Sequence, residues 1–239
     1  MALKDNEIWK ILKDELSLAK RIVALKFSKK EPEGIKKYEE RAFPGLCTQI
    51  KEILEREETF YTIKDQCFCT GGVVAAGVAE SMTREEKKEM IKLHMDMEGS
   101  YKDIETAMSY YDEVEKEIPY PAKKNAAIQL GLFPEISSPD ILLIFCTPKK
   151  ADILSRTYVY TTGNLIKGFG GNGGCTFNIQ YPYVTGKPAF SYSDVAWRKY
   201  TGISDEEITL SFPYEALKAI ISNLPIVAEK YRNYGNLSK

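Results

Sequence analysis

Cysteine thiols are the side chains in this sequence best suited to chemistry, because thiolates bind single metals and iron-sulfur clusters. Cys67 and Cys69 are separated by one residue and are followed by Gly71 and Gly72. In an extended segment, residues two apart point to the same side, so both thiolates can reach one metal centre. The two glycines let backbone amides approach the sulfur atoms of that centre. This short segment is therefore a predicted metal or cofactor site.

Two further cysteines complete a candidate ligand set. Cys47 lies in the first turn of a predicted helix, and Cys175 ends a glycine-rich segment. Thiolate ligation of a [4Fe-4S] cluster takes four cysteines, so we expect Cys47, Cys67, Cys69 and Cys175 to hold one. Cys146 follows a predicted buried strand and is a reserve ligand. The sequence leaves two alternatives open, which are zinc at the same ligands and cysteines that are only small buried hydrophobes.

A glycine-rich segment over residues 163–175 holds six of the 16 glycines. Glycines such as Gly173 and Gly174 let successive backbone amides face an anion or a cluster sulfide. The segment lacks the ending of a P-loop, and it does not open a helix as a dinucleotide-binding loop would. The second hypothesis is a protein without metal, in which this loop and Arg198 bind a small anionic molecule. A flexible surface loop is the remaining interpretation.

His94 is the single histidine, which excludes any site that needs several imidazoles. It lies one turn from Met90 in a segment rich in Glu and Lys, a pattern typical of a helix at the edge of a core. No nucleophile-like context surrounds it, so no Ser/His/Asp set is predicted. The catalytic residues are therefore unknown at this point, and whether the protein is an enzyme stays open.

Composition and charge exclude several classes of protein. The chain has 239 residues, with 33 basic and 34 acidic side chains and a formal net charge of -1, so no attraction to nucleic acid or to an anionic membrane is expected. The N-terminus lacks the apolar stretch of a secretory signal, and no apolar run approaches the roughly 18 residues of a membrane span. We expect a cytoplasmic protein whose partner is a small anionic molecule or a redox protein. Nothing in the sequence indicates the oligomeric state.

Hydrophobic periodicity predicts the elements that must position these residues. Helices are expected over residues 5–20, 45–57, 73–79, 103–117, 149–160 and 214–224, and another begins at a capping box formed by Thr83 and Glu86. Strands are expected over residues 21–27, 60–63, 140–146, 175–183 and 189–192. The strand over 140–146 lacks polar alternation, so we expect it to be buried on both faces. The prediction is an α+β fold, a single mixed domain over residues 1–239 with helices packed on a central β-sheet.

Several motifs recur in a known family. They stand at residues 139–145, 181–191, 197–198 and 212–213, together with a Cys-Thr-Gly-Gly segment that begins at Cys69. On these motifs the chain resembles the domain of unknown function 169 family over roughly residues 16–224. The resemblance implies a cytoplasmic protein of archaea and bacteria, often of anaerobes.

The resemblance also divides the cysteines. Cys47, Cys69 and Cys175 match the pattern of the family, whereas Cys67 and Cys146 look particular to this chain. Members often carry a cysteine close to residues 193–194, and this chain has none there. The resemblance therefore implies no ligand from that segment.

Overall fold

The computed structural model describes residues 3–18, 22–39, 45–122 and 125–234. Seven strands form one mixed sheet in the order β2-β3-β1-β4-β7-β6-β5. Neighbouring strands are antiparallel except for the parallel pair β5 and β6. The strands are β1 (Val23–Ser28), β2 (Phe60–Thr62), β3 (Ala127–Leu132), β4 (Ile141–Cys146), β5 (Lys167–Phe169), β6 (Ala189–Ser191) and β7 (Ile208–Pro213).

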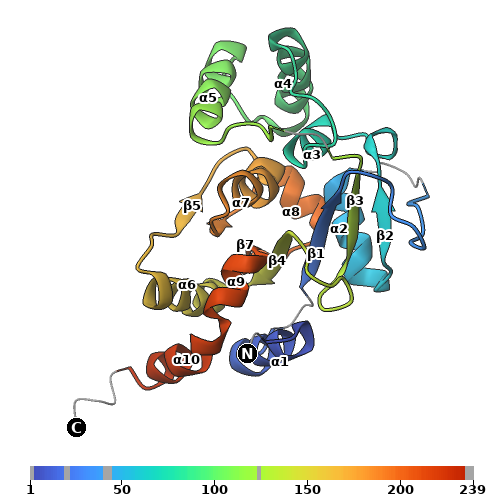
Figure 1. Ribbon diagram of the computed structural model, residues 1–239. Coiled ribbons are helices and arrows are strands. Elements are labelled where there is room, and N and C mark those ends of the chain that lie inside the picture. The colour runs from blue at the N-terminus through green and yellow to red at the C-terminus, as the bar shows by residue number, and fades with distance from the viewer. Residues whose placement is uncertain (1–2, 19–21, 40–44, 123–124, 235–239) are drawn as a thin grey trace.

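Helices cover the sheet on both sides (Figure 1). The α-helices are α1 (Asp5–Leu16), α2 (Leu46–Arg56), α3 (Thr70–Ala75), α4 (Arg84–Glu98), α5 (Ile104–Glu117), α6 (Pro148–Thr162), α7 (Tyr181–Thr185), α8 (Val195–Thr201), α9 (Tyr214–Ile220) and α10 (Leu224–Arg232). Short helical turns lie at η1 (Lys64–Gln66), η2 (Thr176–Gln180) and η3 (Ile221–Asn223), and η2 is a π-helical turn.

The sheet separates two hydrophobic cores. Successive side chains of a strand point to opposite faces, and β4 sends Leu142 and Ile144 into the core formed with α1, α6, α9 and α10. Leu143 and Phe145 point into the other core, which contains α2 and Trp197 of α8. Figure 1 shows α1, α6, α9 and α10 together on one side of the sheet. Because both faces are covered, β4 needs no polar alternation, as the sequence predicted.

The predicted fold class is confirmed, since helices pack on a central sheet of mixed strands. Sequence signals for helix starts also agree with the structure. The capping box that opens α4 is present, with the Glu86 amide donating to Thr83 Oγ1 at 3.2 Å and the Thr83 amide donating to Glu86 Oε2 at 2.8 Å. Pro148 occupies the start of α6 and Pro225 the start of α10, where a missing amide hydrogen costs nothing.

The predicted strand over residues 175–183 is wrong. The segment is instead the π-helical turn η2, which continues directly into α7. Its apolar and polar residues alternate as in a strand, yet the polar ones are buried as well. Asn178 donates to the carbonyl of Gly174 at 2.9 Å, and Gln180 donates to the carbonyls of Ile118 and Pro119 at 3.2 and 3.1 Å. These buried hydrogen bonds, two of them to a segment distant in sequence, outweigh the local β pattern.

Other elements were not predicted from the sequence, namely strands β3, β5 and β7 and helix α8. In β7, Thr209 and Ser211 alternate with apolar residues, which is the pattern of a half-exposed strand. Both residues are nevertheless fully buried. Their hydroxyls have hydrogen-bond partners there, since Thr209 accepts from the indole of Trp197 at 3.0 Å and Ser211 donates to the side-chain carbonyl of Asn178 at 3.4 Å.

The hairpin of α4 and α5 stands apart from both cores. Its helices enclose a small core of their own, formed around Ile91, Ala107 and Met108. Figure 1 shows the pair rising above α3 and α8. Among the described helices, none is long and apolar enough to cross a membrane. The hairpin meets the rest of the protein partly through Tyr110 and Val114 of α5, which pack against the buried rings of Phe177 and Tyr181.

Replacement of Leu143 by alanine tests the central position of β4. Leu143 pairs with Val23 and Ser211 and is fully buried. Loss of its side chain is expected to lower the free energy of unfolding by about 2–5 kcal/mol, because the surrounding core collapses only partly into the cavity. Urea unfolding measures the change. Leu165→Ala is the control, since Leu165 is 81% exposed, and an equal effect of the two variants would contradict the core assignment.

Candidate functional site

A cavity of about 110 Å³ lies beneath the α4–α5 hairpin. We call α4, α5 and the loop between them the roof. The opposite wall carries three thiols, those of Cys47, Cys69 and Cys175, together with the backbone of Gly71, Gly173 and Gly174. The cavity therefore joins the cysteine segment and the glycine-rich segment, which are about a hundred residues apart in the sequence.

The three thiols come from three separate elements. Cys47 lies in the first turn of α2, Cys69 is the residue that caps the start of α3, and Cys175 immediately precedes η2. Gly72 allows these elements to approach. A Cβ atom at that position would lie 2.9 Å from Leu46 Cβ and 3.6 Å from Cys175 Sγ. The glycine is thus required for the close packing of α3 on the start of α2, beside the third thiol.

Burial raises the pKa of two of these thiols, Cys69 and Cys175. The pKa of Cys69 rises to about 11 through burial and, to a smaller extent, the nearby Cys47, while the amides of Gly72 and Gly71 oppose the shift. Those amides lie near the Cys69 sulfur without forming ordinary capping hydrogen bonds. A hydrogen bond with Cys47, and then burial, hold the pKa of Cys175 well above its usual value. Protonated thiols are weak nucleophiles, whereas a bound metal would deprotonate them directly.

The other two cysteines do not reach the cavity. Cys67 is buried in the core on the α2 side of the sheet, and its thiol donates to the carbonyl of Cys69 at 3.7 Å. Burial raises its pKa to about 12. Cys146 belongs to the core on the opposite face of the sheet. The structure therefore separates the reserve ligand from the other cysteines.

The glycine-rich segment is anchored by Asp194. Its Oδ2 accepts from the amides of Gly173 and Gly174 at 3.0 and 2.6 Å, and its Oδ1 accepts from the amide of Trp197 at 2.6 Å. Gly174 also packs against the indole, since a Cβ atom there would lie 2.7 Å from Trp197 Cβ. The two amides that the sequence assigned to an anion are thus occupied by a carboxylate of the chain itself. The segment that carries Cys175 is consequently held in one position.

Arg198 does not join the cavity. Its guanidinium donates to the backbone carbonyls of Tyr192 and Glu207, both at 3.0 Å, and to that of Ser204. An arginine that bonds three carbonyls joins neighbouring loops and has few donors left for a ligand. The predicted pairing of the glycine-rich loop with Arg198 around an anion is therefore not assembled in the structure.

The roof supplies Glu98, which sequence analysis missed, and His94, which it assigned to the edge of a core. His94 and Glu98 of α4 both line the cavity, with Nδ1 of His94 3.5 Å from Oε1 of Glu98. Their spacing of four residues, which places two side chains on one helix face, was the available signal. Glu98 also accepts from the hydroxyl of Ser100 at 3.0 Å. The single histidine and a carboxylate thus face the thiols across the cavity.

Tyrosines form the rest of the roof near the glycine-rich segment. Tyr110 donates to the carbonyl of Asn172 at 2.8 Å, and burial raises the pKa of its hydroxyl to about 12. The rings of Tyr101 and Tyr111 line the cavity, with centroids 6.2 Å apart. The hydroxyl of Tyr101 is buried and has no hydrogen-bond partner at normal length, although Asn172 and Tyr111 lie near it. The hydroxyl oxygen of Tyr101 is therefore a polar atom of the cavity wall that can accept a further hydrogen bond.

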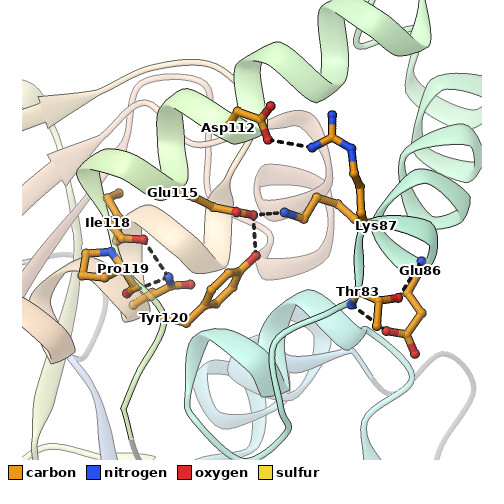
Figure 2. A network of polar contacts seen from close by, with 10 residues as sticks. Thr83, Glu86, Lys87, Asp112, Glu115, Ile118, Pro119 and Tyr120 are labelled. Atoms are coloured by element: carbon orange, nitrogen blue, oxygen red, sulfur yellow. Dashed lines mark hydrogen bonds and ion pairs between the residues drawn. The ribbon is translucent and has the colours of Figure 1, made fainter.

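A polar network holds the roof against η2 (Figure 2). Glu115 of α5 accepts from the buried ammonium of Lys87 on α4 and from the hydroxyl of Tyr120, the latter at 2.7 Å. Just beyond α5, the carbonyls of Ile118 and Pro119 accept from Gln180. The network ties both helices of the roof to the turn that follows Cys175.

Within the described residues, no group of three or more His, Cys, Asp or Glu side chains is arranged to hold a single metal ion. The thiols that line the cavity are therefore neighbours without being arranged around one point.

Comparisons with known proteins agree with the resemblance seen in the sequence. The model of the DUF169 family, described as "Uncharacterised ArCR", matches residues 11–223. The chain is 29% identical over 220 residues to "Uncharacterized protein MJ0308" of Methanocaldococcus jannaschii, which covers 89% of this chain and 90% of the relative. No solved structure matches the chain.

Replacement of Asp194 by alanine tests the anchor of the glycine-rich segment. The variant loses a helix cap and leaves the amides of Gly173 and Gly174 without their acceptor, so the free energy of unfolding is expected to fall by about 2–4 kcal/mol. Asp194→Asn keeps one acceptor oxygen, so its free energy of unfolding is expected to lie between those of the wild type and Asp194→Ala. Urea unfolding provides the measurement.

Asp103→Ala is the matched control for this prediction. Asp103 caps α5 by accepting from the amide of Thr106, and it holds no second segment. Its replacement is expected to cost less than that of Asp194. Equal losses of stability would show that Asp194 acts only as a helix cap.

Proposed function

The chain belongs to the DUF169 family, and we propose that it binds a [4Fe-4S] cluster through Cys47, Cys69 and Cys175, beside a cavity that admits a small molecule. The family is described as uncharacterised, so the proposal rests on the site itself. The observation that carries it is the convergence of three thiols from three elements on one cavity wall.

The position of these thiols argues against a purely structural role. A cysteine that serves only as a small hydrophobe is expected inside a packed core, where neighbouring atoms surround it. Cys146 fits that description, because it lies in the core on the α1 side of the sheet. A thiol on a cavity wall forgoes contacts on one side. Cys47 also belongs to the core on the α2 side of the sheet, and Cys69 and Cys175 pack against that core. That all three line one cavity wall as well favours a ligand beside them.

The arrangement favours a cluster over one metal ion. In the described part of the chain, no three ligand side chains surround a single point, as a zinc ion would need. In a four-iron cluster each thiolate binds a different iron, so the thiolates need not surround one point. Cys47 and Cys175, which are hydrogen-bonded to each other, would move apart to bind two irons. Amides close to a ligand sulfur also favour a cluster, since hydrogen bonds to the sulfurs tune its reduction potential. The amides of Gly71 and Gly72 approach Cys69 in this way.

Three cavity-facing thiolates leave one iron without a cysteine ligand. An iron of that kind, open to an adjoining cavity, can bind and activate a small molecule, whereas pure electron transfer needs only shielding and a route to a partner. Cys67 donates to the carbonyl of Cys69 and is the candidate fourth ligand if the cluster is instead fully coordinated. The proposed role is therefore redox or substrate-activating chemistry at the cavity.

Anaerobic reconstitution with iron and sulfide tests the proposal. The full-length protein is expected to become brown and to bind about four iron and four sulfide per chain. Cys47→Ser, Cys69→Ser and Cys175→Ser are each expected to lose most of that iron, because a serine hydroxyl is a poor substitute for a thiolate. Cys146→Ser is the matched control and should keep full occupancy. A colourless wild-type protein with no metal after reconstitution would refute the proposal.

The variant Cys67→Ser distinguishes two forms of the site. Retention of the cluster in this variant supports ligation by three cysteines and an open iron. Loss of the cluster would overturn the three-ligand assignment and make Cys67 the fourth ligand. One zinc per chain, without visible absorption, would replace the cluster with a zinc site.

A further inference from the structure

We infer that the cavity binds a small organic ammonium ion, held by the carboxylate of Glu98 and by the side chains of Tyr101 and Tyr111. The inference goes beyond the proposed cluster, because it depends on the roof of the cavity and not on the thiols. It also reverses the charge of the ligand that the glycine-rich loop and Arg198 had indicated.

The charges on the described walls of the cavity favour a cation. Three carboxylates line it, those of Glu98, Glu115 and Asp194, and no lysine or arginine is among the described lining residues. Glu115 is paired with the ammonium of Lys87. Asp194 is occupied by three backbone amides. Glu98 is therefore the carboxylate that remains to meet a ligand.

Glu98 has unused hydrogen-bonding capacity. Its side chain is only 12% exposed, and it accepts from Ser100 and lies 3.5 Å from His94. An ionised carboxylate offers about four lone-pair sites, so these two neighbours leave acceptor positions free. A carboxylate that is this far removed from water gains most from a cation that also donates hydrogen bonds. An ammonium group has both properties.

The two tyrosines complete the site for such a group. The electron-rich face of an aromatic ring attracts an ammonium within about 6 Å of its centre, and Tyr101 and Tyr111 both line the cavity. The buried hydroxyl of Tyr101 has no hydrogen-bond partner at normal length. Asn172 and Tyr111 lie near this hydroxyl, and its oxygen can also accept a hydrogen bond from an ammonium N–H.

The size of the cavity limits the enclosed part of the ligand to a few heavy atoms. An apolar cavity of about 150 Å³ admits a molecule the size of benzene, and this cavity measures about 110 Å³. The cavity is partly open to solvent, so its volume limits only the part of a ligand that lies inside it. Nucleotides and phosphorylated cofactors carry the wrong charge for walls lined by carboxylates. A short-chain primary amine matches both the volume and the polar groups.

Three probes of similar size and different charge test the inference, namely propylammonium, 1-propanol and propionate. Calorimetry and thermal unfolding are carried out on the full-length protein, both as purified and after removal of any bound metal. Propylammonium is expected to bind at millimolar concentration and to raise the melting temperature by mass action. The other two probes are expected to bind at least about tenfold more weakly, since they lack a charge-assisted hydrogen bond.

Two variants and one control locate the binding group. Glu98→Gln is expected to weaken propylammonium binding by about tenfold or more, and Tyr101→Phe by a few-fold, through loss of the acceptor hydroxyl. Glu89→Gln is the control, because Glu89 lies on the same helix, is 73% exposed and pairs with Lys92. It should leave binding unchanged. Tyr101→Phe also keeps the test decisive if Glu98→Gln is too unstable to study.

The outcomes separate this inference from the proposed cluster. Binding of propionate as tight as that of propylammonium, or no binding of propylammonium, would overturn the ammonium site. Unchanged binding in both the Glu98 and Tyr101 variants would do the same. If the amine binds to a protein that never takes up iron, the ammonium site stands and the cluster proposal fails alone.

Discussion

The carboxylate of Asp194 makes the contacts on which the cavity depends. It joins the glycine-rich segment to the start of α8 by accepting from two amides of the one and one amide of the other. Gly174 then packs on Trp197, which is fully buried and donates a hydrogen bond to Thr209 of β7. Cys175 begins the next turn, so its distance from Cys47 is set by this anchor. The thiol wall is thus connected to the centre of the sheet through an unbroken series of buried contacts.

The two walls of the cavity differ in how they are supported. The thiol wall adjoins the large core on the α2 side of the sheet, so Cys47 and Cys69 are positioned by extensive packing. The roof has its own small core, and a buried ion pair joins its two helices. It meets η2 and α7 through Tyr110 and Val114 of α5, which pack against Phe177 and Tyr181, and through the hydrogen bonds of Gln180 just beyond α5. Segments with few buried contacts open at lower free energy than the rest of a protein. A firmly packed thiol wall and a less firmly attached roof suit a site that must admit a ligand from solvent.

The positions of Cys146 and Arg198 show how a strong residue type can mislead. Cys146 follows a buried strand, as many functional residues do, yet the strand alternation turns it toward the core opposite the cavity. Arg198 lies within a motif of the family, and its guanidinium bonds three carbonyls of nearby loops. The residue type alone therefore did not predict the role of either side chain, because its position in the fold decides which groups it contacts.

The sequence by itself determined the features that depend on near neighbours in the chain. Hydrophobic periodicity and the Thr83 capping box predicted most helices, and the unbroken apolar run of β4 predicted a strand covered on both faces. Only the tertiary structure decided that residues 176–180 form a π-helical turn, because Gln180 bonds carbonyls beyond α5 that lie some sixty residues away. It likewise brought His94 and Glu98 over the thiols. Those side chains meet through packing between distant segments, which no local pattern encodes.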